Sequence, residues 1–210
     1  MGVALGHGFT LAVTDAGAVF CFGFSRQGGL GHGSLESEVL PRQIEALTQT
    51  RRRFVAVAAG DFHALALTDG GELYGWGDGG ANGHGREERT PQQVTALIGQ
   101  RVKLVYALDS VSCAVTEKGE LFTWGSNYDC SLGCAGPQVT PKRVAGLSGI
   151  EVAAVAIAWT HTLAADADGV VWAFGHSSAL GLGASGPEDR APVPMPTPIP
   201  TLRVRVLNSP

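Results

Sequence analysis

The chain repeats itself about every fifty residues, and this period limits its fold more than any other feature. In each unit a predicted strand ends in an aromatic residue next to a glycine. The four stops read Phe20-Cys21-Phe22-Gly23, Tyr74-Gly75-Trp76-Gly77, Phe122-Thr123-Trp124-Gly125 and Trp172-Ala173-Phe174-Gly175. A period of this length is typical of solenoids, arrays and propellers. Such scaffolds mostly offer binding surfaces, so the repeat also argues against an enzyme.

The second unit shows the internal pattern of one repeat. Its predicted strands cover 55–59, 63–68 and 72–77, and a short outer strand begins at 91–94. Asp69-Gly70-Gly71 separates the second strand from the third, as expected of a tight hairpin turn in which glycine supplies a positive φ. The other units follow the same order, and no long segment has a helical period of apolar residues. Four antiparallel strands per unit, stacked face to face, predict the blades of a propeller.

The second unit also carries a specific family resemblance. Gly60 to Val94 follows the pattern G-x-x-H-[TA]-x-A-[VL]-T-x-x-G-x-[VL]-[YF]-x-[WF]-G, then L-G-x-G, then P-x-x-V, although Asn82 stands where the leucine of L-G-x-G is usual. This pattern resembles the repeat of the regulator of chromosome condensation family. The resemblance implies an all-β fold, a β-propeller of the chromosome-condensation-regulator type, whose complete ring has seven blades. Four units predict four blades of four antiparallel strands and a partial, open ring.

We expect a single repeat domain over residues 1–210. Its repeats are placed at about 1–53, 54–101, 102–149 and 150–202, with 203–210 starting a further strand. An open ring leaves apolar blade flanks at both ends. A fragment of a longer protein, a homodimer joined through the exposed end blades, and a tighter four-bladed closure are the three explanations. The proline-rich stretch 191–200 is interpreted as a stiff connector, with an SH3-type ligand as the alternative.

Composition and motifs exclude several classes of function. The formal net charge is −4, so we expect no direct nucleic-acid binding and no attraction to an anionic membrane. The four cysteines lack zinc-site spacing and no signal peptide is evident, which predicts reduced thiols in an intracellular protein, cytoplasmic or nuclear. Glycine-rich matches to a dinucleotide fingerprint do not open helices. We therefore expect no enzymatic activity, no cofactor and no metal site.

Comparison between units separates structural residues from candidate functional ones. Phe9, His63, Val111 and His161 share one slot, and a slot that accepts Phe and Val is a packing position. Trp76 and Trp124 are likewise structural, because Phe22 and Phe174 replace them. Exposed turn positions are predicted for His32 and His84. The basic run Arg51-Arg52-Arg53 is interpreted as a solvated loop.

Two other slots vary in chemistry while their surroundings repeat. The first follows the first strand and holds His7, Asp61, Asp109 and Trp159. The second follows the aromatic-glycine stop and holds Phe24, Asp78, Ser126 and His176. With two neighbouring residues, the candidate partner-binding set is His7, Asp61, Asp109, Trp159, Arg26, Asp78 and Asn127. The alternative is that these side chains only cap turns, as Asp readily does.

The preferred function is a non-catalytic protein–protein interaction scaffold that binds a protein partner through the variable rim loops. The family resemblance implies an alternative, guanine-nucleotide exchange on a small Ras-like GTPase. Against exchange, no insertion comparable to a projecting wedge is present. Photoreception of the plant UV-B type would need clustered tryptophans, and only Ala158-Trp159-Thr160-His161-Thr162 approximates that motif.

Overall fold

The computed structural model describes residues 2–183 and 191–206, which form four sheets of four antiparallel strands. The first sheet contains β1 (Gly2–Leu5), β2 (Phe9–Val13), β3 (Val19–Gly23) and β4 (Glu38–Gln43), and the second contains β5 (Phe54–Ala59), β6 (His63–Thr68), β7 (Leu73–Gly77) and β8 (Glu88–Gln93). The third contains β9 (Val102–Leu108), β10 (Val111–Thr116), β11 (Leu121–Gly125) and β12 (Gln138–Arg143), and the fourth contains β13 (Val152–Ile157), β14 (His161–Asp166), β15 (Val170–Gly175) and β16 (Val193–Arg203). Neighbours in sequence are neighbours in each sheet. The predicted all-β fold with four blades is confirmed.

The hairpin between the second and third strands is built as the sequence predicts. In blade 2, Leu67 pairs with Leu73 across the turn, and Gly71 has a φ of +81°. A Cβ at Gly71 would come within about 3 Å of the backbone of Arg101 and Val102 in the next blade. The turn glycine therefore permits both the left-handed backbone and the close approach of the following blade.

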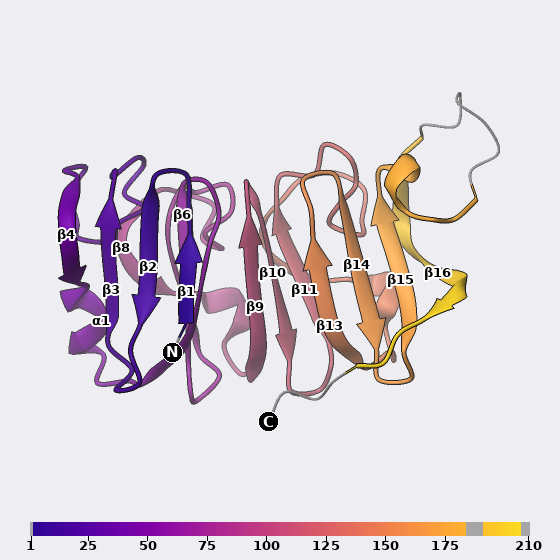
Figure 1. Cartoon of the computed structure of the whole chain (residues 1–210), viewed down its shortest axis with the longest axis horizontal. Helices are drawn as coiled ribbons and strands as arrows, with labels where there is room; N and C mark the ends of the chain where they lie inside the picture. The colour runs from indigo at the N-terminus through magenta and orange to yellow at the C-terminus, as the bar shows by residue number, and fades with distance from the viewer. Residues whose placement is uncertain (1, 184–190, 207–210) are drawn as a thin grey trace.

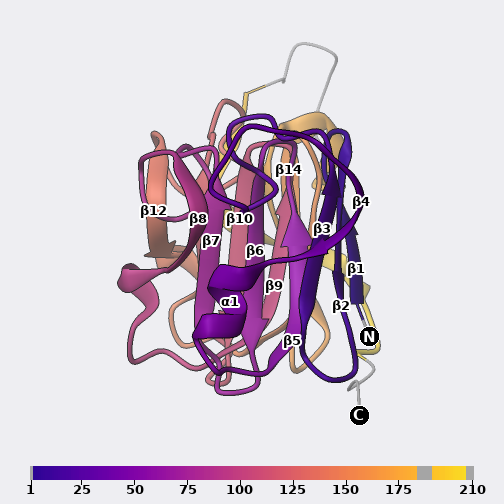
Figure 2. The same cartoon turned by 90° about the vertical axis from the view of Figure 1, so that its left-hand side faces the viewer.

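The blades stand side by side in a row, with the first and fourth at opposite ends (Figure 1). Turned by 90°, the sheets are seen stacked behind one another (Figure 2). The core lies between them. One apolar cluster joins Leu11, Cys21 and Leu30 of blade 1 to Tyr74 and Trp76 of blade 2. Similar clusters join blade 2 to blade 3 and blade 3 to blade 4.

Short helical turns, which the sequence did not predict, follow the outer strands of blades 1 to 3 and the third strand of blade 4. They are α1 (Glu45–Gln49), η1 (Thr95–Leu97), η2 (Ala145–Leu147) and η3 (Ser177–Ala179). Leu47, Leu97 and Leu147 are the buried residues of the first three. One leucine per turn fixes the chain as it passes to the next blade, and segments this short carry no readable helical period.

The proline-rich stretch is a strand, so its interpretation as a connector is wrong. Residues 193–203 form β16, in which Thr197 pairs with Ala173, Pro198 with Trp172 and Arg203 with Val170. Proline is tolerated there because β16 is an edge strand, whose outward N–H groups have no partner in the sheet. Residue 191 and Pro192 precede the strand.

The further strand expected at 203–210 does not form over 204–206, and 207–210 lie outside the described residues. Val204 nevertheless donates its N–H to the Gly169 carbonyl at 2.9 Å. Val152 donates to Gly119 in the same way at 2.9 Å, where one blade passes to the next. Residue 204 therefore occupies the position at which a first strand begins in the other units. Within 2–183 and 191–206, no helix is long and apolar enough to cross a membrane.

Candidate functional site

One edge of the row of blades, running along all four of them and here named the loop rim, carries both variable slots. It consists of the turns between first and second strands and the loops between third and fourth strands, and it forms the upper edge in Figure 1. The opposite end, named the hairpin rim, carries the turns between second and third strands. The sequence analysis treated the two slots separately. Because the strands of each blade are antiparallel and in sequence order, both slots lie on the same rim.

The same main-chain hydrogen bond joins the two slots in every blade. The residue of the second slot donates its N–H to the carbonyl oxygen next to the first slot, at 2.8–2.9 Å. The four pairs are Phe24 with Gly8, Asp78 with Phe62, Ser126 with Ser110 and His176 with Thr160. Each blade therefore presents two adjacent variable side chains from a fixed backbone.

Main-chain bonds also link the first slot between blades. The His7 N–H donates to the Asp61 carbonyl at 3.1 Å, and the Asp61 N–H donates to the Asp109 carbonyl at 2.8 Å. His7 Nδ1 lies 3.6 Å from Asp61 Oδ2, and its ring is tilted over Phe62 with centroids 5.7 Å apart. Asp109 has a φ of +51°, a left-handed conformation that Asp tolerates better than most residues. His7, Asp61 and Asp109 thus form a fixed row across three blades.

A hollow of about 490 Å³ lies beside this row, between blades 2 and 3. Asp78 and Gly80 line it from the blade 2 loop, and Ser126, Asn127 and Tyr128 line it from the blade 3 loop. Tyr128 is 95% exposed. Sequence reasoning missed Tyr128, although an aromatic residue in a glycine-bounded loop, outside any strand period, was an available signal. Asp78 and Asn127 are brought together here as predicted site residues.

The Asn127 side chain is hydrogen-bonded within its own loop. Its side-chain amide donates to the carbonyls of Cys134 at 2.8 Å and Gly136 at 2.7 Å, and its oxygen accepts from the Leu132 N–H at 3.0 Å. An amide with all of these contacts is committed to loop closure. Asn127 therefore shapes the wall of the hollow more than it offers free polar atoms to a partner.

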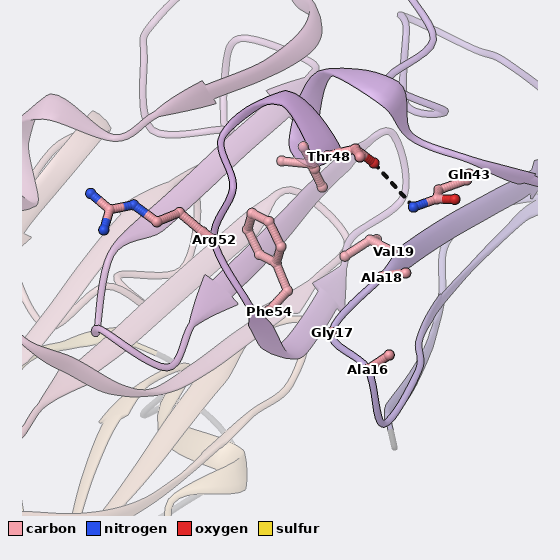
Figure 3. A pocket seen from close by; sticks show the side chains of 9 residues that line it. Ala16, Gly17, Ala18, Val19, Gln43, Thr48, Arg52 and Phe54 are labelled. Atoms are coloured by element: carbon pink, nitrogen blue, oxygen red, sulfur yellow. Dashed lines mark hydrogen bonds between the residues drawn. The ribbon is translucent and has the colours of Figure 1, made fainter.

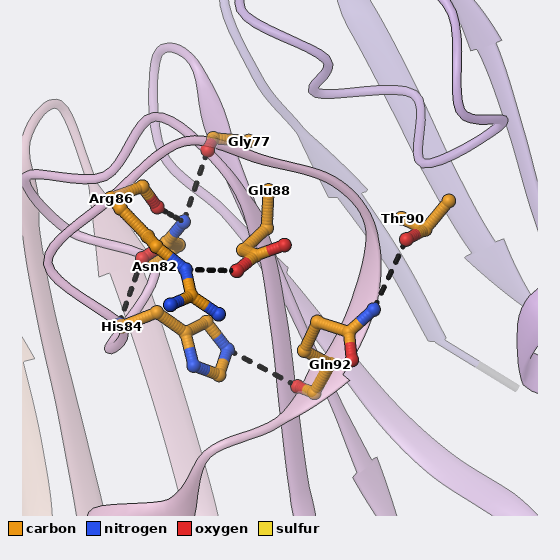
Figure 4. Close-up of polar contacts among 7 residues, drawn as sticks. All are labelled: Gly77, Asn82, His84, Arg86, Glu88, Thr90 and Gln92. Atoms are coloured by element: carbon orange, nitrogen blue, oxygen red, sulfur yellow. Dashed lines mark hydrogen bonds and ion pairs between the residues drawn. The ribbon is translucent and has the colours of Figure 1, made fainter.

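Asn82 does the same in the shorter blade 2 loop (Figure 4). Its amide donates to the Gly77 carbonyl at 3.0 Å and the Arg86 carbonyl at 2.8 Å, and its oxygen accepts from the His84 N–H at 2.9 Å. The side chain is fully buried. Its departure from the usual leucine thus replaces apolar packing with three hydrogen bonds that hold the loop bearing Asp78.

The two remaining candidates lie apart from the hollow. Trp159 is 77% exposed on the turn of blade 4, where no equivalent position in the other blades carries tryptophan. Arg26 is exposed in the loop of blade 1. Both side chains stand on the loop rim, but neither lines the hollow.

His63 is a core residue, as the slot comparison predicts. It is buried, and Nε2 lies 2.7 Å from the Ser112 hydroxyl of the next blade, which donates to the Ala81 carbonyl at 2.9 Å. Because the hydroxyl proton is committed to Ala81, the Ser112 oxygen accepts from Nε2–H of neutral His63. Desolvation lowers the pKa of His63 to about 3. His161 in the equivalent slot is half-buried.

The prediction of exposed turn positions for His32 and His84 is wrong, since both are half-buried. His32 Nε2 lies 3.5 Å from the Cys21 carbonyl, and His84 Nε2 lies 3.2 Å from the Gln92 carbonyl. Desolvation lowers the pKa of His32. These rings hold the loop against the strand that carries the acceptor carbonyl.

The cysteines are all free thiols, of which Cys21 and Cys113 are buried and Cys130 and Cys134 are half-buried. Burial raises the pKa of Cys21 to about 12 and raises that of Cys113 as well. Protonated, inaccessible thiols do not act as nucleophiles. Cys21 and Cys113 therefore pack as small apolar residues.

The hairpin rim has a smaller hollow of about 170 Å³, lined by Val19, Gln43, Thr48, Arg52 and Phe54 (Figure 3). Gln43 Nε2 donates to Thr48 Oγ1 at 3.0 Å across one side. The basic run beside it lies in an exposed loop, as predicted, and two of its side chains make surface contacts. Arg52 contacts Glu72 at 2.9 Å, and Arg53 donates to the Asp15 carbonyl at 3.0 Å.

Comparison with known proteins agrees with this architecture. The regulator of chromosome condensation (RCC1) repeat matches residues 16–67 and 118–165, and a second form of that repeat matches 54–86. The chain is 33% identical to the human E3 ubiquitin-protein ligase HERC2 over 187 residues, which cover 86% of the chain and 4% of HERC2. It is 33% identical over 198 residues to the mitochondrial RCC1 domain-containing protein RUG3 of Arabidopsis thaliana, covering 87% of the chain and 43% of RUG3. The chain thus spans less than half the length of these relatives.

Solved structures show the same fold. Human WBSCR16 superposes with a TM-score of 0.80 at 25% identity, covering 94% of this chain and 53% of WBSCR16. Prp20p from Saccharomyces cerevisiae superposes with a TM-score of 0.61 at 20% identity, covering 99% of this chain and 66% of Prp20p.

Proposed function

Because the chain belongs to the regulator of chromosome condensation (RCC1) repeat family, we propose that it is a non-catalytic binding module whose loop rim holds a protein partner. His7, Asp61 and Asp109 supply a polar row, and the hollow bounded by Asp78 and Tyr128 lies beside it. Trp159 and Arg26 extend the exposed surface along the same rim.

The repeated hydrogen bond between the two variable slots is the observation that carries this proposal. It fixes eight backbone positions on one rim in the same way, while their side chains differ from blade to blade. A scaffold that repeats its backbone and varies its exposed side chains is suited to recognition by a rigid surface. Exposed aromatic residues such as Trp159 and Tyr128 are typical of the anchors that dominate binding energy.

The test removes charge from the rim without disturbing the backbone. In the double variant Asp61→Asn and Asp109→Asn, asparagine is preferred to alanine at 109 because it tolerates the left-handed φ of +51°. The matched control is Asp69→Asn with Asp168→Asn, which removes two exposed carboxylates from the hairpin rim. The wild-type chain is first used to capture a partner from cell lysate. We expect the rim variant to bind that partner at least about tenfold more weakly, with an unchanged melting temperature. Equal binding by the wild type, the rim variant and the control would refute the proposal.

Guanine-nucleotide exchange on a small Ras-like GTPase is the second candidate. It is supported by Prp20p, whose structure was described together with its binding properties to Gsp1p and histones. Exchange factors bind the nucleotide-free GTPase more tightly than the loaded form, which is a linkage effect. The test is release of fluorescent GDP from a panel of small GTPases. Faster release with the wild type, but not with the Asp61→Asn and Asp109→Asn variant, would place exchange ahead of simple binding.

A further inference from the structure

The hollow on the loop rim contains the Asp78 carboxylate, which has no partner in the part of the chain that the structure describes. Among the described residues, the Asp78 carboxylate takes part in no hydrogen bond and no ion pair, whereas its backbone is fixed by the Asp78 N–H bond to Phe62 at 2.9 Å. Its carbonyl accepts from the Asn82 N–H at 3.1 Å. The loop thus fixes the backbone N–H and carbonyl of Asp78 and leaves its carboxylate available to a ligand.

Among residues 2–183 and 191–206, no cation pairs with this carboxylate, and no Lys or Arg of these residues lines the hollow. Arg86 follows nearby in the same loop, but its guanidinium is engaged by Glu88 at 2.6 Å (Figure 4). The loop is tight here, since a Cβ at Gly79 would come within about 2.4 Å of the Arg86 backbone. The charge of Asp78 is therefore uncompensated within the described part of the chain.

Part of the surrounding wall is aromatic and apolar, beside the polar residues Ser110, Ser126 and Asn127. Tyr128 is almost fully exposed, and Pro137 and the half-exposed Val139 complete the side of the hollow formed by blade 3. An unpaired carboxylate beside an accessible aromatic ring suits one kind of side chain in particular. The arginine guanidinium is planar, stacks on aromatic faces, presents forked donors to a carboxylate and keeps an apolar stem.

Neighbouring charges on the rim favour the same ligand. Asp61 and Asp109 lie in the polar row, and Asp129 follows Tyr128 in the loop. Within the described part of the chain, Asp61 alone of these three has an ionisable neighbour, His7 at 3.6 Å. A rim with an excess of carboxylates attracts a basic segment and repels an acidic one.

We propose that this hollow binds an arginine side chain of the protein partner, with the guanidinium between the Asp78 carboxylate and the Tyr128 ring. This inference rests on the proposed binding function and specifies the partner: a segment with an exposed arginine, placed between blades 2 and 3. Asp78 would supply the charge-assisted hydrogen bonds, and Tyr128 with Val139 would cover the side-chain stem.

The experiment uses the whole chain and labelled nine-residue peptide pools with a fixed central residue in a Gly, Ser, Ala and Gln background. The central residue is arginine in one pool and citrulline, its neutral isostere, in the other. Anisotropy at low salt is expected to give binding about five to tenfold tighter for the arginine pool. Asp78→Asn and Tyr128→Ser should each remove most of this preference, and Asp69→Asn on the hairpin rim should keep it.

Equal binding of the arginine and citrulline pools would overturn the inference, as would an arginine preference that survives Asp78→Asn. The capture experiment separates this failure from that of the binding function. If Asp61→Asn with Asp109→Asn loses the captured partner while the peptide preference is absent, the rim binds a partner of other chemistry. If the captured partner is insensitive to both sets of rim variants, the binding function itself falls.

Discussion

Blades 1 and 2 use the same strand positions for aromatic residues, but these residues are less buried in blade 1 than in blade 2. In blade 2, Tyr74 is 9% exposed and Trp76 is 0% exposed, because blade 1 covers them. In blade 1, the equivalent Phe20 and Phe22 are only partly buried. Val3 on the same sheet is 65% exposed. The comparison shows that an aromatic repeat position has no burial of its own: the adjacent blade supplies it.

The interfaces between blades also contain indole hydrogen bonds, which the outer face of blade 1 lacks among the described residues. Trp76 Nε1 donates to the Gly29 carbonyl at 2.9 Å, and Trp124 Nε1 donates to the Ala81 carbonyl at 2.7 Å, in each case in the preceding blade. Phe22 has no such donor. Blade stacking in this chain thus combines apolar burial with a directional bond that fixes how two blades meet.

The largest expected difference comes from truncating the aromatic residue. Trp76→Ala should lower the free energy of unfolding by about 3–5 kcal/mol, because it leaves a cavity between two blades and removes the bond to Gly29. Phe22→Ala on the free face should cost less than about 1.5 kcal/mol. Urea denaturation followed by circular dichroism measures both. Similar losses for the two variants would show that Phe22 is covered in solution.

The next difference is in the response to acid. His63 is buried between blades with its pKa lowered to about 3, whereas His161 in the same slot of blade 4 is half-buried. Between pH 6.5 and 3, His63 is protonated in the unfolded chain but neutral in the folded one. The free energy of unfolding therefore falls as pH falls. The full contribution is present above pH 6.5. The loss is about 1.4 kcal/mol per pH unit, or roughly 3 kcal/mol by pH 4.

The matched pair for this prediction is His63→Gln and His161→Gln. The first should flatten the fall in unfolding free energy between pH 6.5 and 4, relative to wild type, and the second should leave it in place. Chemical denaturation at each pH provides the comparison. An undiminished acid slope in His63→Gln would mean that the proton uptake belongs to other groups.

The fold could be predicted well from the sequence because the same pattern of strands and turns occurs in four units. Hairpin glycines, aromatic stops and the shared slot of His63 could all be compared between units, and the structure confirms the blades and the burial of His63. The proline-rich strand β16 was missed, because composition suggested a connector and pairing with β15 depends on an edge position that only the sheet reveals.

The candidate site was harder to predict, because its geometry depends on contacts between loops. Asp61, Asp109 and Asp78 could be found because they occupy slots whose residues vary between units, and the structure places them on one rim. Asn127 was predicted as a polar contact residue like them, yet its side-chain amide is hydrogen-bonded within its own loop. Tyr128 has no equivalent in the repeat pattern, so a comparison of slots passed over it.

The smallest expected difference concerns a single hydroxyl. Thr162 of blade 4 donates to the Ser131 carbonyl of blade 3 at 2.8 Å, whereas the equivalent Thr10 on the free face of blade 1 has no side-chain hydrogen bond among the described residues. Thr162→Ala should cost about 1 kcal/mol or slightly more, because a buried carbonyl also loses its partner, and Thr10→Ala should change stability by less than about 0.5 kcal/mol. Amide exchange at Leu132 and Gly133 would sharpen the comparison, since faster exchange in Thr162→Ala alone places the loss at the contact between blades. Equal effects of the two substitutions would instead assign the cost to strand propensity, which both threonines share.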